Sequence, residues 1–113
     1  MSFATINSRA LLGVEAVEVK VETHLSNGLP SFAIVGLPEK AVKESKERVR
    51  SAIINSGLEF PDRRITVNLA PADLLKEGSH FDLPIAIGLL AAMDVLPMDE
   101  IGAYTALGEL GLR

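Results

Sequence analysis

The sequence predicts an α/β (α+β) fold, a two-layer sandwich in which two helices pack on one face of a sheet. Three observations lead to this prediction. Val17, Val19 and Val21 alternate with charged residues, which is typical of a strand with one buried face. Apolar and small residues recur every three or four positions over residues 38–56, and residues 83–93 carry no charge. The first pattern favours a sheet, and the other two favour helices.

Strand-like patterns occur in several parts of the chain. Residues 3–23 form the first such stretch, and the turn sequence Ser-Asn-Gly at 26–28 separates it from a short strand at 31–35. Residues 64–70 are rich in β-branched side chains and are followed by a proline, so we expect a further strand there. A last short strand is predicted over 103–107.

Two helices complete the predicted order β, β, β, α, β, α, β. Pro38 suits the first turn of the first helix, and Gly57 suits its C-terminal end. Asp82 is predicted to cap the second helix, with Pro84 in its first turn. Because this second helix is apolar on nearly every side, we expect it to be the central buried helix.

Composition limits the function classes. The chain has 113 residues, 11 Lys and Arg, 15 Asp and Glu, a net charge of −4 and no cysteine. These values indicate one domain in a reducing cytoplasm, without disulfides or thiolate metal sites. No metal site is predicted, since His24 and His80 lie far apart in the sequence. No phosphate-binding loop, secretory signal or membrane-spanning segment is recognised.

Basic residues gather in the second half of the first helix, the turn after it and the segment 71–78. A cluster of this kind can contact phosphates through charge-assisted hydrogen bonds, although a solvated helix face with salt bridges is the more common explanation. No aromatic residues appear interleaved with the cluster, which weighs against base stacking. The candidate nucleic-acid-binding residues are Arg48, Arg50, Arg63, Arg64 and Lys76.

Ser79 is a candidate nucleophile, because a serine, a histidine, a lysine and acidic residues crowd the segment 71–82. The alternative is that Ser79 or Asp82 only caps the following helix. Neighbouring side chains such as those of Ser79 and His80 diverge, so they seldom make the hydrogen bond that a general base needs.

Several longer motifs carry a family resemblance. They are Ile-Val-Gly-Leu-Pro at 34–38, the charged segment 42–53, Val-Asn-Leu-Ala-Pro-Ala-Asp at 67–73 and the segment 76–86, which starts Lys-Glu-Gly. Over essentially its whole length, the chain resembles the N-terminal domain of the ComM/YifB family, the Mg-chelatase ChlI-like AAA+ ATPases. The resemblance implies the fold of the Lon protease proteolytic domain and of the second domain of a small-subunit ribosomal protein, with a left-handed βαβ crossover.

The resemblance also implies that the domain is proteolytically inactive. When Lys76, Glu77 and Gly78 are aligned with the Lys-Asp-Gly of the Lon motif, Ser79 falls on its proline and His80 on its nucleophile. The Lon lysine lies well beyond the Gly-Glu motif that Glu109 matches. We therefore expect no catalytic residue in this chain.

As a member of such a family, the chain is expected to form one domain, 1–113, that precedes an AAA+ module. ATP and Mg²⁺ are expected on that module, and no cofactor is expected in these residues. The expected function is to assist DNA binding or assembly in a cytoplasmic, ATP-driven DNA branch-migration motor. DNA and self-association into a hexameric ring are the expected partners, and no membrane is expected. Two alternatives remain open, a structural oligomerisation module and a Lon-type serine hydrolase.

Overall fold

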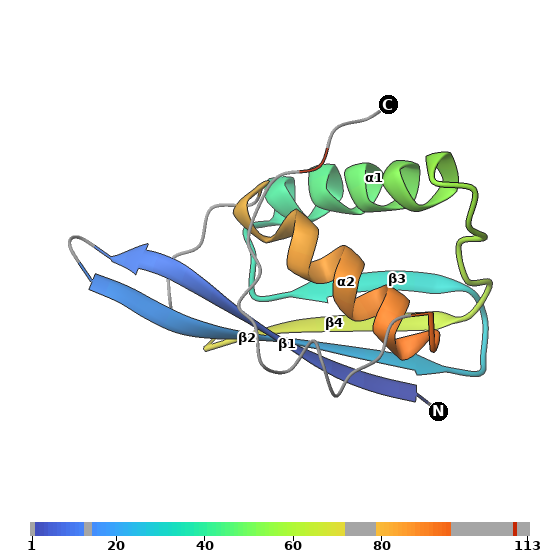
Figure 1. Cartoon of the computed structure of the whole chain (residues 1–113), viewed down its shortest axis with the longest axis horizontal. Helices are drawn as coiled ribbons and strands as arrows, with labels where there is room; N and C mark the ends of the chain where they lie inside the picture. The colour runs from blue at the N-terminus through green and yellow to red at the C-terminus, as the bar shows by residue number, and fades with distance from the viewer. Residues whose placement is uncertain (1, 13–14, 72–78, 96–109, 111–113) are drawn as a thin grey trace.

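A four-stranded sheet covered on one face by two helices makes up the fold (Figure 1). The structure, a computed structural model, describes residues 2–12, 15–71, 79–95 and 110. Within these residues the strands lie in the order β1-β2-β4-β3, which places β1 and β3 at the edges. The predicted two-layer α+β architecture is therefore confirmed. The strand predicted over 103–107 lies outside the described residues.

The first two strands form a long antiparallel pair, β1 (Ser2–Leu12) and β2 (Glu15–Ser26). Ile6 is paired with Val21, and both side chains are buried beneath the helices. The predicted strand-like stretch 3–23 thus contains two strands. The alternation of apolar and polar residues determines which side of each strand faces the core.

The strands β3 (Ser31–Val35) and β4 (Arg64–Ala70) are parallel, and α1 (Glu39–Asn55) connects them. β4 also pairs antiparallel with β2, so it lies inside the sheet. The unit β3–α1–β4 is the crossover for which a left-handed course is expected; its handedness stays a prediction.

The end of α1 agrees with the predicted role of Gly57. This glycine has a φ of +82° and follows the C-cap residue Ser56. Its N–H donates to the carbonyl of Ile54, and the N–H of Leu58 donates to the carbonyl of Ile53. This pair of hydrogen bonds is the Schellman motif, which satisfies the last carbonyls of a helix.

The second helix, α2 (Asp82–Ala92), is the buried central helix that the sequence predicts. Eight of its eleven residues are buried, and it packs against β1, β2 and α1. A short 3-10 helix, η1 (Ser79–Phe81), precedes it. The core consists of the inward side chains of all four strands together with α1 and α2, including Ile6, Val19, Val21, Leu25, Val49, Ile65, Val67, Leu69, Phe81, Ile85 and Leu89. No helix among the described residues is long and apolar enough to cross a membrane.

One predicted capping interaction is wrong. Asp82 is the first residue of α2, and the N-cap position belongs to Phe81, with no side-chain capping hydrogen bond. The carboxylate of Asp82 instead accepts hydrogen bonds from Ser45 and Arg48 of α1. Asp82 binds these donors and does not cap the helix because the packing of α1 against α2 brings the charged Arg48 guanidinium to its carboxylate.

Candidate nucleic-acid interface

The structure places four of the five predicted basic residues, and they belong to different parts of the fold. Arg48 and Arg50 belong to α1, Arg63 precedes β4, and Arg64 is the first residue of β4. Lys76 lies outside the described residues. The four described arginines, although close in sequence, therefore do not form one compact patch.

Arg48 lies on the flank of α1 that meets α2. Its guanidinium donates to both carboxylate oxygens of Asp82, from Nε at 2.5 Å and from Nη2 at 3.3 Å. The Arg48 side chain is 16% exposed and that of Asp82 is fully buried. A weaker contact of 3.8 Å joins Arg48 to Glu44 on the same helix. Arg48 is thus a partner in an interhelical ion pair.

Arg50 lies on a different flank of the same helix, beside the segment that leads into β4. Its guanidinium carbon is 4.6 Å from the centre of the Phe60 ring, the distance of a cation–π contact. The Phe60 ring in turn contacts the ring of Phe32, with centres 5.5 Å apart. An aromatic pair therefore supports the arginine, contrary to the expectation that aromatic residues are absent from the cluster.

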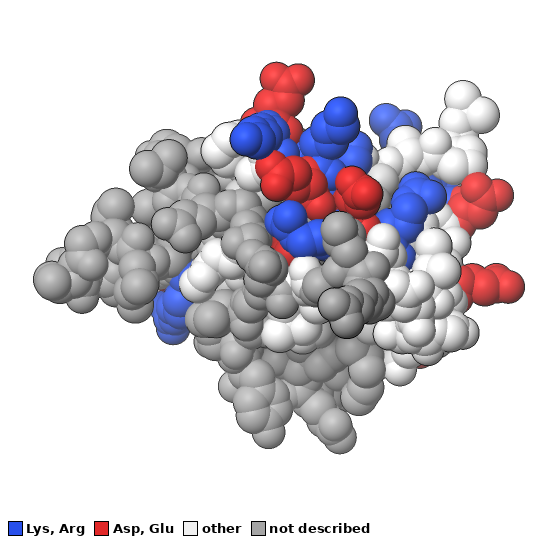
Figure 2. Space-filling model, turned by 90° about the horizontal axis from the view of Figure 1, so that it is seen from above, with Lys and Arg blue, Asp and Glu red and all other residues white. Residues whose placement is uncertain are grey.

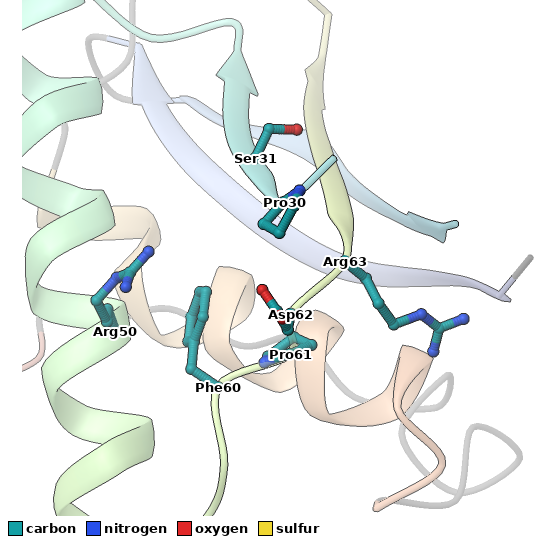
Figure 3. A pocket seen from close by; sticks show the side chains of 7 residues that line it. All are labelled: Pro30, Ser31, Arg50, Phe60, Pro61, Asp62 and Arg63. Atoms are coloured by element: carbon teal, nitrogen blue, oxygen red, sulfur yellow. The ribbon is translucent and has the colours of Figure 1, made fainter. Parts of the chain in front are cut away.

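Arg50 and Phe60 line a hollow of about 300 Å³, which we call the Phe60 pocket. In Figure 3 the Asp62 carboxylate points toward the space beside the Phe60 ring, whereas the Arg63 side chain extends away from the other lining side chains. The wall comes from the turn before β3, from α1 and from the lead into β4. Its residues are Pro30, Ser31, Arg50, Phe60, Pro61, Asp62 and Arg63.

Arg64 lies on the open face of the sheet, whereas Arg63 belongs to the segment before β4 and lines the Phe60 pocket. In β4, Ile65, Val67 and Leu69 are buried beneath the helices, so Arg64, Thr66 and Asn68 face the other way. Arg64 is exposed on the open face of the sheet, next to the turn that contains Gly28. The start of β4 at Arg64 thus separates the surroundings of two consecutive arginines.

A second hollow continues from the Phe60 pocket along α1. Phe32, Lys43, Lys46, Glu47 and Arg50 line it, so the two hollows share Arg50. Lys43, Lys46 and Arg50 recur at spacings of three and four on one flank of α1, above the edge strand β3. We call these three side chains the α1 cationic stripe.

The α1 cationic stripe is a local feature of a mixed surface. Figure 2, which looks onto α1, shows Lys and Arg side chains interspersed with Asp and Glu side chains. Glu39 and Glu47 lie beside the stripe. Of the residues that form the stripe and support it, the sequence-based candidates include Arg50 but not Lys43, Lys46 or Phe60. The helical spacing of 43, 46 and 50 was the signal that could have identified Lys43.

The candidate hydrolase residues do not form a described catalytic pair. Ser79 begins η1, and His80 follows it. The Nε2 atom of His80 makes a hydrogen bond of 2.8 Å with the backbone oxygen of Arg9. Its ring also packs edge-on against Phe81, with centres 5.0 Å apart. These contacts hold the imidazole against β1 and give it a structural role.

The open face of the sheet carries its own charged network. Lys20 donates to Asn7 at 2.7 Å and pairs with Glu18 at 3.0 Å, while Arg9 lies 3.6 Å from Glu18. The hydrogen bond from Lys20, its positive charge and that of Arg9 lower the pKa of the Glu18 carboxyl. This network is exposed to solvent and separate from the α1 cationic stripe.

Comparisons with known proteins identify the family of the chain. The sequence model of the family described as subunit ChlI of Mg-chelatase matches residues 21–113. The chain is 58% identical to the YifB protein of Salmonella typhimurium and 57% identical to the competence protein ComM of Haemophilus influenzae. A protein of Mycobacterium bovis is 38% identical. Each alignment covers 99% of this chain and 22% of the relative. The chain therefore belongs to the Mg-chelatase ChlI-like family, together with ComM and YifB.

Proposed function

We propose that this domain helps a larger ATP-driven motor to hold DNA, and that the α1 cationic stripe makes the contact. The single observation that carries the proposal is the alignment of Lys43, Lys46 and Arg50 on one flank of α1. Three cations at successive helical turns can follow a phosphate backbone, and each one neutralised by a phosphate releases a counterion. The competence name of one relative supports a role in DNA handling.

Of the five arginine and lysine residues predicted from the sequence, the proposal keeps Arg50, which belongs to the stripe. Arg63 lines the Phe60 pocket and lies outside the stripe. Arg48 already pairs with buried Asp82, so a phosphate would have to compete with a carboxylate for it. Arg64 faces the opposite side of the sheet. Lys76 stays a prediction, as do ATP and Mg²⁺ on an AAA+ module and the hexameric ring.

The test is DNA binding by the full-length protein over a series of salt concentrations. Replacing Lys43 and Lys46 together by Gln should weaken binding to single-stranded and forked DNA roughly tenfold at moderate salt. The slope of log K against log salt should fall in magnitude by about 1.5, because two phosphate contacts are lost. Arg64→Gln is the matched control, because it removes one exposed cation from the other face.

Two results of this binding experiment would overturn the proposal. Unchanged affinity and an unchanged salt slope for the Lys43/Lys46 variant would overturn the proposal. An equal loss for Arg64→Gln would also overturn it, because one cation on the open face of the sheet would then matter as much as two cations of the stripe. A double variant of Arg63 and Arg64 cannot make this distinction, since neither residue belongs to the stripe.

A second candidate function, assembly of the ring, is favoured by one observation at the sheet edge. β3 is an edge strand of the described sheet, and Val35 on it is 52% exposed. Edge strands present backbone groups that can pair with another chain. Val35→Lys should shift the full-length protein toward smaller assemblies in mass photometry, and an unchanged assembly would remove this candidate.

A further inference from the structure

The Phe60 pocket has a chemical character that phosphate binding does not explain. A phosphate site is lined by cations and N–H donors, but this pocket also contains the exposed carboxylate of Asp62. Two prolines, Pro30 and Pro61, contribute flat apolar walls. The pocket is therefore suited to a ligand that is flat, partly apolar and equipped with a hydrogen-bond donor.

The guanidinium of Arg50, which packs on the Phe60 ring, supplies a planar surface for such a ligand. Phe60 holds the Arg50 guanidinium over its ring, and Phe32 supports Phe60 from beneath. A guanidinium packed on an aromatic ring on one side can stack on a second planar group on its other side. Nucleobases unstacked from their neighbours are recognised in this way, on aromatic rings or on arginine planes.

We propose that the Phe60 pocket binds an unpaired nucleobase that carries an exocyclic amino group. The base stacks on Arg50, and its amino group donates a hydrogen bond to the Asp62 carboxylate, the pairing that acidic side chains make with cytosine. The strand continues from this pocket along Lys43 and Lys46, which contact its phosphates. A base within a duplex is stacked on both faces, so the pocket selects single strands.

This inference rests on the proposed function, since the α1 cationic stripe brings the strand to the pocket. The experiment measures fluorescence anisotropy of the full-length protein with labelled 20-mers of deoxycytidine or thymidine and with a 20-base-pair duplex. Thymine lacks an exocyclic amino group and presents carbonyl oxygens to Asp62. We expect the deoxycytidine strand to bind roughly five- to tenfold more tightly than the thymidine strand.

Asp62→Asn should reduce this preference to less than twofold and leave duplex binding unchanged. Glu59→Gln is the matched control, because it removes an exposed carboxylate three residues before Asp62 that does not line the pocket, and it should retain the preference. Phe60→Leu should weaken binding of both single strands roughly tenfold, because Arg50 loses its aromatic support. Circular dichroism of this variant checks that the fold is intact.

The two proposals fail in different ways. If the Lys43/Lys46 variant loses affinity but Asp62→Asn keeps the wild-type preference, the pocket proposal is overturned and the stripe remains. The pocket proposal is also overturned if the wild-type protein binds both single strands equally. If Asp62→Asn abolishes the preference while the Lys43/Lys46 variant binds normally, the pocket is supported and the stripe is rejected.

Discussion

Arg48 and Asp82, 34 positions apart in the sequence, form an ion pair that joins α1 to the start of α2. The carboxylate also accepts hydrogen bonds from the Ser45 hydroxyl at 2.7 Å and from the backbone N–H of Leu110 at 3.2 Å. One fully buried side chain thus connects α1, α2 and the chain at residue 110. A buried carboxylate is tolerated here because several donors surround it.

Asp82→Ala should lower the free energy of unfolding by about 3–5 kcal/mol, because it leaves the Arg48 charge and the Ser45 hydroxyl without their acceptor. Urea denaturation followed by circular dichroism measures the change. Glu44→Ala is the control, since the exposed Glu44–Arg48 contact contributes only about 0.3–0.5 kcal/mol. Equal losses for the two variants would show that the buried ion pair does not stabilise the domain.

The helices and strands could be predicted because their signals are local. Apolar residues at period two mark β2, and those at spacings of three and four mark α1. The Arg48–Asp82 pair could not be predicted in this way, because the packing of two helices creates it. The same holds for Arg50 and Phe60, which meet only when the chain after α1 folds back. Sequence proximity alone grouped Arg63 with Arg64, although Arg64 begins β4 on the open face of the sheet and Arg63 belongs to the segment before the strand.

Gly36→Ala should destabilise the domain more than Gly57→Ala. Both glycines have positive φ, +105° and +82°, so each substitution costs about 1–2 kcal/mol of backbone strain. A Cβ at Gly36 would also lie 2.5 Å from the backbone oxygen of Leu69, whereas nothing lies within 4 Å of one at Gly57. Thermal unfolding should show an additional loss of about 1–3 kcal/mol at Gly36. A larger effect at Gly57 would contradict this close approach of β3 to β4.

Lys20→Gln should raise the pKa of Glu18, because the hydrogen bond and charge of Lys20 are the main causes of its lowered value. A group whose pKa is lower in the folded state stabilises the fold above its unfolded pKa. That contribution is lost as the pH falls through the folded pKa. Carboxyl-carbon NMR titration of Glu18 in both proteins measures the shift. Identical titration midpoints would show that Lys20 does not pair with Glu18 in solution.

Gly88→Ala should destabilise the protein even though alanine favours helices. A Cβ at Gly88 would lie 2.7 Å from Oγ1 of Thr23 and 3.3 Å from Cγ1 of Ile6, because α2 packs closely on β1 and β2. Overpacking of this kind costs about 1–3 kcal/mol, more than the propensity gain of about 1 kcal/mol can offset.

Thr23→Ala provides the test of this mechanism. The Thr23 hydroxyl is buried without a hydrogen-bond partner among the described residues, so its removal breaks no such bond. It also removes the atom nearest to the new Cβ. In a double-mutant cycle, Thr23→Ala should therefore reduce the cost of Gly88→Ala by about 1 kcal/mol. Urea denaturation of the four proteins measures the coupling. Additive losses would mean that Thr23 does not limit the size of residue 88, and that the contact with Ile6 or the helix itself sets the requirement for glycine.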